Sequence, residues 1–380
     1  MTYPAARELC IIMLKYIIKR ILLAVIILLG VSLIIYVLVR IQPGENFIRT
    51  KYTAALAQDS TGQVEEMVQR MEKTYGLDVS PVEGYLRWLN NVVHGDWGES
   101  FIFSVDSGKV DKFYIVNTGG TTQYVKYTNE SEVPAGAQTV ERSIATSDVF
   151  YIIFSKCGIS FVISLIATIF EFLIAIPLGI LSARKQYGVL DYTVTVLAMM
   201  GISLPTFFLG ALMLKIFSID LGWFPYAGLT NPNSGLPRLL DIAHHLFLPL
   251  CTLIILSIGA LMRYTRTNML EVMNADYIRT ARAKGLSEHT VIYKHAFRNS
   301  LIPIVTMLAG ILPGLFGGAM ITETVFSIDG VGKAAYKAVT QGDIPFIMAY
   351  NMFLSLLTVI GTLFSDIMYA VVDPRVKITD

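Results

Sequence analysis

The chain has 380 residues, of which 54% are hydrophobic and only 16% are charged, and its formal net charge is +1 at pH 7. A soluble domain carries about 25% charged residues, so this composition excludes an ordinary soluble protein and indicates an integral membrane protein. The three cysteines, Cys10, Cys157 and Cys251, lie outside the polar region 41–149, so we expect no disulfide there.

Six apolar runs are long enough to cross a bilayer, for which a helix needs about 20 residues. Backbone polar groups in lipid must bond within their own segment, so we expect all six runs to be helices. The first run is too long for a signal-peptide core, and we interpret it as a retained span. The runs cover approximately residues 17–39, 155–183, 191–217, 246–265, 302–325 and 346–372.

Basic residues in the loops between these runs predict the orientation of the chain. Lysines and arginines gather in the N-terminal flank, after the second and fourth runs, and in the C-terminal tail. Both termini are therefore expected in the cytoplasm. The loop after the fourth run is the most basic, with Arg263, Arg266, Arg279, Arg282, Lys284, Lys294 and Arg298.

Residues 1–40 then form a cytoplasmic N-terminus and the first span, and 41–150 form an extracellular region. In that region Val64, Met67, Val68 and Met71 share one helical face, and Ser60 with Gln63 fits a capping box. A second amphipathic helix is predicted in "VEGYLRWLNNVV". The stretch "KFYIVNTGGTTQYVKY" predicts two strands around a Gly-Gly turn, within an insertion at about 105–147.

Residues 151–380 contain the other five predicted spans and a long cytoplasmic loop at about 266–300. On a helix that begins near Asp276, the side chains of Tyr277, Thr280, Ala281 and Lys284 lie on one face. Small Ala281 and Ala283 would let a partner approach this helix closely. Gly285 fits a C-cap and Ser287 an N-cap, so we predict a helix–turn–helix projection. A solvated basic loop would explain the charges, but not the small residues, the glycine or the length.

Signatures of several enzyme classes are absent from the sequence. It contains no HExxH, no GxSxG and no GxxxxGK[ST], so zincin, α/β-hydrolase and P-loop chemistry are not expected. We predict no catalytic residue and no metal site. The adjacent His244 and His245 would point about 100° apart on a helix and do not suit one metal ion.

The segments "YIRTARAKGL" and "HAFRNSLIP" resemble the cytoplasmic coupling loop of ABC importer permeases of the oligopeptide/dipeptide/nickel family. Other stretches resemble the same family in the same order, including "YLRWLNNVVHGDWGESF", "GISLPTFFLGALMLKIFS" and "VVDPR". The resemblance covers roughly residues 15–104 and 148–377, and six spans with a long first external loop are similar to the B-type subunit. It implies an all-α, six-helix permease fold, here with a small extracellular α+β insertion.

The resemblance implies that ATPase subunits dock on the cytoplasmic loop and that its helix acts as a lever. It also implies a second homologous permease, two ABC ATPases, an extracellular substrate-binding protein, and ATP and Mg on the partners rather than on this chain. Arg279-Thr280-Ala281 stands where the general motif has Glu-Ala-Ala, so a salt bridge from that Glu is not expected. The coupling residues would be Asp276, Tyr277, Arg279, Thr280, Ala281, Arg282, Lys284 and Gly285.

Charged and helix-deforming residues inside the spans are candidates for the translocation path. For Glu171 three alternatives stay open: it can bind substrate, pair with a residue of the companion subunit, or make a structural hydrogen bond. The glycines and prolines can line the path or simply reflect membrane-helix composition. Asp366 is expected to pair or pack, and Lys215 to reach the interface. The path candidates are Glu171, Pro313, Gly314, Gly317, Gly318 and Glu323.

Together with the membrane spans, the resemblance implies a multi-pass permease subunit of an ATP-driven oligopeptide importer in a bacterial plasma membrane. A nickel or other small-solute importer of the same family is one alternative, and a membrane sensor is another. The insertion at about 105–147 would either dock the substrate-binding protein or decorate the surface.

Overall fold

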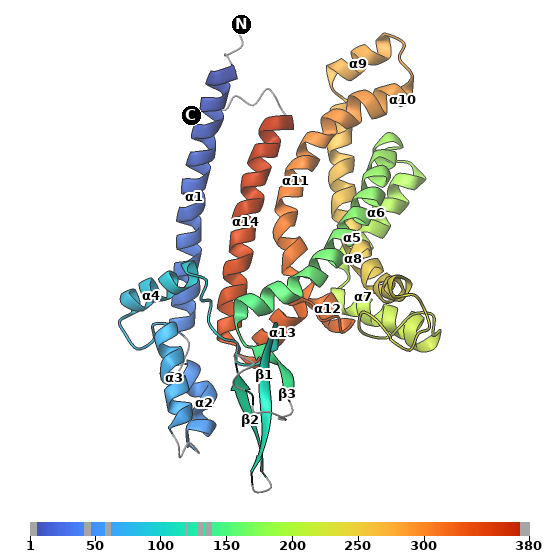
Figure 1. Cartoon of the computed structure of the whole chain (residues 1–380). Helices are drawn as coiled ribbons and strands as arrows, with labels where there is room; N and C mark the ends of the chain where they lie inside the picture. Colours follow the sequence, from blue (N-terminus) through green and yellow to red (C-terminus); the bar gives the residue numbers. More distant parts are fainter. Residues whose placement is uncertain are drawn as a thin grey trace. The chain divides into compact units, whose positions relative to one another are not determined.

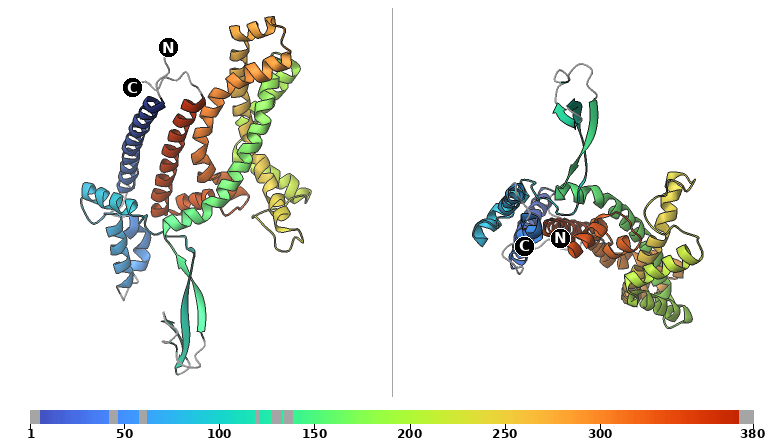
Figure 2. Two further views of the ribbon diagram at one scale, coloured as in Figure 1. Left: turned by 45° about the horizontal axis from the view of Figure 1, so that its top comes forward. Right: turned by 90° about the horizontal axis from the view of Figure 1, so that it is seen from below.

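The computed structural model describes residues 6–41, 47–57, 62–118, 121–127, 133 and 139–372 (Figure 1). The chain divides into two compact units, and Figure 2 gives two further views of their elements. The first unit contains residues 1–35, 156–340 and 350–380, and the second contains 36–155 and 341–349. The last turn of the first helix, residues 36–40, belongs to the second unit.

The second unit contains three short helices, α2 (Phe47–Ala57), α3 (Gln63–Thr74) and α4 (Pro81–Val93). The two amphipathic helices predicted here are confirmed as α3 and α4. Helix α4 begins as expected for its sequence: Ser80 accepts a hydrogen bond from the Glu83 N–H, and Pro81 occupies the first turn. The capping box at Ser60 is wrong, because Gly62 is the N-cap of α3, with φ 73°, while Ser60 lies outside the described residues.

A three-stranded antiparallel sheet forms the rest of the second unit. The strands β1 (Val105–Thr118), β2 (Thr121–Tyr127) and β3 (Thr139–Thr146) lie in the order β2-β1-β3. Thr118 pairs with Thr121, which confirms the predicted hairpin. Strand β3 was not predicted, and it pairs with β1 from Val105↔Thr146 to Tyr114↔Thr139.

Four long helices match predicted spans: α1 (Ala6–Arg40), α5 (Val149–Arg184), α8 (Arg238–Met273) and α14 (Ile344–Val372). Within the described residues each of these is long and apolar enough to cross a membrane. Their exposed aliphatic side chains, such as Leu22, Ile26 and Leu38 on α1, fit a lipid environment rather than water.

The third predicted span, 191–217, is not one straight helix. It consists of α6 (Val189–Ser203), α7 (Thr206–Met213) and a π-helical segment, η2 (Leu214–Asp220), and the two arms are bent by 101°. The break lies at Leu204 and Pro205. Proline disfavours the helical conformation in the residue before it, and Leu204 accordingly has ψ 131°.

The fifth predicted span, 302–325, is also interrupted. Helix α11 (Phe297–Gly317) ends at Gly318, and two shorter helices follow, α12 (Met320–Val325) and α13 (Val331–Gln341). Gly318 has φ 76°, and a Cβ there would lie 2.5 Å from Glu323 Oε1, so only glycine fits this turn. Six continuous spans are therefore not confirmed: the described residues contain four, or five if the bent pair counts as one.

Candidate functional site

The predicted cytoplasmic projection is formed by α9 (Asp276–Ala283), α10 (Glu288–Thr290) and a π-helical segment, η3 (Val291–Ala296), that leads into α11. Ile278 and Ala281 are the buried residues of α9. They belong to one apolar cluster with side chains of α5, α8 and η3. The other buried members of the cluster are Ile180, Ala183, Met269, Val291, Ile292 and Ala296.

Burial of an isoleucine side chain such as Ile278, which is 0% exposed, stabilises a structure by about 1.5–3 kcal/mol. The cluster therefore fixes α9 to the ends of α5 and α8 and to the segment that begins α11. A displacement of α9 would move all three helix ends together.

The turn after α9 has the geometry that its sequence predicts. Gly285 has φ 76°, its N–H donates to Arg282 O at 2.9 Å, and the Leu286 N–H donates to Ala281 O at 3.4 Å. These two bonds form a Schellman motif, which requires a left-handed residue at Gly285. Ser287 then accepts a hydrogen bond from the Thr290 N–H, as the N-cap prediction requires.

An ion pair braces this turn. Arg282 Nη2 lies 2.9 Å from Glu288 Oε1, and Arg282 Nε donates to Glu288 Oε2 at 3.3 Å. The hydrogen bonds from Arg282 lower the pKa of the Glu288 carboxyl, and the same carboxylate raises the pKa of Arg282. Both side chains are exposed, so the pair steers the geometry more than it stabilises the fold.

Most of the predicted coupling residues share the solvent-exposed surface of α9 and its turn. Ala281 is the exception, because it is only 7% exposed and packs inside this chain, so it does not offer the small contact that we predicted. Ala283 is exposed and keeps that role. The exposed members of the predicted set are Asp276, Tyr277, Arg279, Thr280, Arg282, Lys284 and Gly285.

An ion pair that the sequence did not predict joins the ends of the neighbouring helices, with Asp191 buried and Arg266 part-buried. Asp191 of α6 accepts hydrogen bonds from Arg266 Nε and Nη2 of α8, both at 2.7 Å. It also accepts from Ser182 Oγ of α5 and from the Tyr187 N–H at 3.0 Å. Asp191 thereby links α5, α6 and α8 below the projection. The sequence signal that could have indicated this role is an acidic residue at the start of an apolar run.

Glu323 does not line an open path as predicted. It is 1% exposed, and its carboxylate accepts hydrogen bonds from Ser160 Oγ at 2.8 Å, the Ala319 N–H at 3.0 Å and the Lys333 N–H at 2.9 Å. Ser160 Oγ in turn accepts from the Val331 N–H at 2.9 Å. The carboxylate therefore joins α5, the break after α11 and the start of α13.

The remaining path candidates have different surroundings in the part of the chain that the structure describes. An apolar groove of about 590 Å³ lies between α5, α11 and α14, but none of the six predicted path residues lines it. Glu171 is half-buried and interacts with Ser257 of α8. Gly317 is buried and its carbonyl accepts from Tyr350 Oη at 2.6 Å, whereas Pro313 lies inside α11 and an added Cβ at Gly314 would meet nothing within 4 Å.

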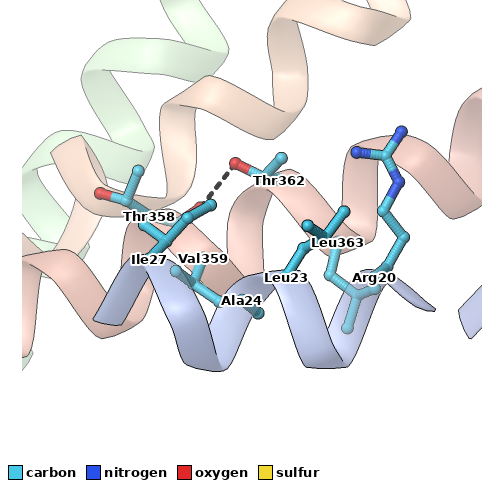
Figure 3. Close-up of a pocket in the computed structure, with 8 residues that line it drawn as sticks. All are labelled: Arg20, Leu23, Ala24, Ile27, Thr358, Val359, Thr362 and Leu363. Atoms are coloured by element: carbon cyan, nitrogen blue, oxygen red, sulfur yellow. Dashed lines mark hydrogen bonds between the residues drawn. The ribbon is translucent and has the colours of Figure 1, made fainter. Parts of the chain in front are cut away.

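A second groove, of about 210 Å³, lies between α1 and α14 (Figure 3). Thr358 and Thr362 line it, and each hydroxyl donates to a carbonyl of its own helix at 2.8 Å, so both threonines are internally satisfied. The other lining residues are Arg20, Leu23, Ala24, Ile27, Val359 and Leu363. This surface offers an apolar contact for lipid or another helix.

Among the described residues, no group of three or more His, Cys, Asp or Glu side chains could hold a metal ion. His244 Nε2 lies 2.8 Å from Trp223 O, and His245 Nδ1 lies 2.8 Å from Asp241 O. The two rings therefore have separate backbone partners.

Comparison with known proteins assigns this architecture to a family. Residues 175–378 match the model for "Binding-protein-dependent transport system inner membrane component", and residues 13–102 match its N-terminal companion. The chain is 34% identical to the oligopeptide transport system permease protein AppB of Bacillus subtilis (strain 168) over 365 residues, which cover 96% of this chain and 100% of AppB.

Other relatives are similar over nearly the full length. A putative peptide permease of Brucella suis biovar 1 (strain 1330) is 31% identical, covering 97% of this chain and 100% of the relative. The dipeptide permease DppB of Bacillus subtilis (strain 168) is 29% identical, covering 96% and 99%. A structure titled as an inward-facing MetNI methionine ABC transporter has a TM-score of 0.46 and 17% identity, covering 59% of this chain and 97% of that chain. The chain belongs to the family of binding-protein-dependent transport system inner membrane components.

Proposed function

We propose that this chain is the permease subunit of an ATP-driven peptide importer. The observation that carries the proposal is the full-length similarity to permeases named for oligopeptide and dipeptide transport, and the packing of the short helix α9 on α5, α8 and η3 supports it. Transport of this kind requires no covalent chemistry in the permease. ATP and Mg would act on the partner subunits.

The proposed assembly contains a second homologous permease, two ABC ATPases and an extracellular substrate-binding protein, in a bacterial plasma membrane. Both termini and α9 would face the cytoplasm, as the basic loops suggest. The exposed surface of α9, with Tyr277, Thr280 and Lys284, would dock on an ATPase.

The packing of α9 supports a rigid-body mechanism. Ile278 and Ala281 attach α9 to α5, α8 and η3, and Asp191 bonded to Arg266 ties α6 to the same group. Closure of the ATPases would shift α9, and the attached helix ends would follow it without local rearrangement. That shift would open and close the path in the membrane.

We place the path along α5 and α11, where Pro313 lies inside α11 and a Cβ added at the neighbouring Gly314 would meet nothing within 4 Å. Peptides differ in their side chains, so a path with few strong contacts suits them, and the binding protein would supply most of the selectivity. The contact between Glu171 and Ser257 favours a helix-packing role for that glutamate over direct substrate binding.

The test is purification of the tagged chain from its native membrane, with the accompanying chains identified by mass spectrometry. We expect two P-loop ATPases and a second permease to accompany it, and uptake of labelled di- and oligopeptides by the reconstituted complex. Uptake of a nickel chelate in place of peptides would reassign the cargo. Absence of any ATPase under conditions that preserve membrane complexes would overturn the proposal that this chain is part of an ATP-driven importer.

A matched pair of variants tests the docking surface. Tyr277→Ala on α9 should reduce the amount of bound ATPase, whereas Tyr226→Ala, an exposed tyrosine in the loop before α8, should not. Equal amounts of ATPase with both variants would remove Tyr277 from the docking surface.

A further inference from the structure

Helix α4 of the second unit carries three distinct faces. One face is buried in the unit and contains Gly84 and Trp88. A polar strip follows around the helix, with Glu83, Arg87 and Asn90. The third face is an apolar stripe, Val82, Leu86, Leu89 and Val93, whose spacing of four, three and four residues keeps it within one narrow sector.

The apolar stripe is not covered by the part of the chain that the structure describes. Val82 is 72% exposed, Leu86 is 59% exposed and Val93 is 75% exposed, while Leu89 between them is half-buried. Gly84 and Trp88 already form the face of α4 that packs inside the unit, so the unit does not need the apolar stripe for its own packing. A contiguous apolar surface of this kind marks a contact with lipid or with another protein.

The position of α4 is fixed against the last turn of α1. Tyr36 Oη donates to Gly76 O at 3.2 Å, and Arg40 donates to Gly76 O at 2.8 Å and to Val79 O at 2.6 Å. Gly76 also touches α4 directly, since a Cβ at Gly84 would lie 2.1 Å from Gly76 O. These contacts pin the start of α4 to residues 36–40.

Residues 36–40 end the 23-residue candidate membrane span Ile18–Arg40, so they mark a membrane boundary. The ring of Tyr36 lies 5.7 Å from the rings of Tyr85 and Trp88 on α4. Tyrosine and tryptophan concentrate where a membrane meets water.

We propose that α4 is an interfacial helix, with the stripe Val82, Leu86, Leu89 and Val93 inserted among the lipids at the membrane surface. Its pattern fits that role, because an interfacial helix buries one apolar face at the headgroup boundary and keeps a polar strip in water. The ion pairs of Arg87 with Asp78 at 3.0 Å and with Glu83 at 3.3 Å neutralise charge along that strip. The proposed orientation of the chain places this contact in the outer leaflet. The lipid contact itself depends neither on that orientation nor on the identity of the transported substrate.

The test uses spin labels in the assembled complex, reconstituted into phosphatidylethanolamine–phosphatidylglycerol vesicles. Cys10, Cys157 and Cys251 are replaced first, and transport is verified. Leu86→Cys and Val93→Cys then carry a nitroxide, and Asn90→Cys on the polar strip of the same helix is the matched control. Collision rates with oxygen, which partitions into lipid, and with a water-soluble nickel chelate are measured.

We expect the oxygen-to-nickel ratio at positions 86 and 93 to be severalfold higher than at position 90. Nickel accessibility equal to that of position 90 would show a stripe in water and overturn the proposal. Low accessibility to both reagents would also overturn it, because it would show the stripe covered by a partner protein. A bimane fluorophore at position 86, quenched by lipid-borne nitroxides, gives the same decision without a spin label on the protein.

Discussion

At the scale of single residues, the buried carboxylate of Glu323 is distinguished by the hydrogen-bond donors that surround it. A carboxylate with two oxygens accepts from Ser160 Oγ and from the backbone N–H groups of Ala319 and Lys333. Every one of these partners is a donor. The site therefore suits a side chain that accepts hydrogen bonds through both of its terminal atoms, as a carboxylate does.

Glu323→Gln should destabilise the chain, because the new amide NH2 would face N–H donors and leave buried groups unpaired. One such loss costs about 1–3 kcal/mol. Thermal unfolding of the detergent-solubilised protein measures the effect, with Glu171→Gln as the control. Glu171 is only half-buried and its partner is a hydroxyl, which can either donate or accept, so the control should lose less stability. An unfolding temperature unchanged by Glu323→Gln would contradict the hydrogen-bond network.

At the scale of elements, the Schellman turn sets the direction in which the chain leaves α9. Gly285 has φ 76° and an added Cβ would meet nothing within 4 Å, so its requirement is conformational and not steric. A β-branched residue held in that conformation costs about 1–3 kcal/mol. The turn would escape this strain by changing its path, and η3 and α11 follow directly after it.

Gly285→Val should therefore uncouple ATP hydrolysis from uptake while membrane insertion stays normal. The ratio of peptide transported to ATP hydrolysed, measured in proteoliposomes, reports the effect. Gly222→Val is a matched control, because Gly222 has φ 64°, also has nothing within 4 Å, and lies in the loop before α8, far along the chain from the projection. Normal coupling in the Gly285→Val variant would show that this turn takes no part in coupling ATP hydrolysis to uptake. Equal uncoupling by both variants would point to general strain.

The Arg282–Glu288 ion pair gives the same turn a pH dependence. The folded state lowers the pKa of Glu288, so its stabilising effect is complete above the ordinary carboxyl range and is lost as the pH falls through the lowered pKa. The protection factors of the amides of residues 284–290, which correct for the slower intrinsic exchange in acid, should decrease as the pH falls. Glu288→Gln should show the lower protection already at pH 7, with little further change on acidification. The effect is small, at most about 1 kcal/mol, because the pair is exposed.

Sequence patterns predicted the elements whose chemistry is local, and missed those that depend on distant partners. The stop at Gly285 and the cap at Ser287 depend on neighbouring residues, so composition and spacing were sufficient. Strand β3 forms only by pairing with β1, and its polar sequence carried no signal of its own. Glu323 was recognised as an intramembrane acid, but its burial depends on Ser160, 163 residues away in the chain.

The bend at Leu204–Pro205 did have a local signal, since proline follows an apolar run there. The prediction of one straight helix was based on the length and hydropathy of the whole run and not on this proline. The length of an apolar run shows whether a segment can cross a membrane, but not whether it is straight. Asp191 was missed for a similar reason: the third run was assessed by length, whereas the role of Asp191 comes from Arg266 on α8.

At the scale of the whole molecule, the three-stranded sheet is an insertion whose removal would leave the chain segments on either side of it joined. Val105 and Thr146 are paired on neighbouring strands, so the two ends of the insertion meet. Excision of residues 107–144 with a short Gly-Ser link should therefore leave α2–α4 and α5 joined as before. We expect the shortened chain to insert and to assemble with its partners in normal amounts.

Size-exclusion chromatography of the complex tests that expectation, and uptake with and without the binding protein then separates the two roles of the sheet. Loss of binding-protein-dependent uptake in an assembled complex would assign the sheet to docking. Normal uptake would assign it to surface decoration. Failure to assemble would contradict the prediction itself, because it would make the sheet part of the folding unit despite its closed base at Val105 and Thr146.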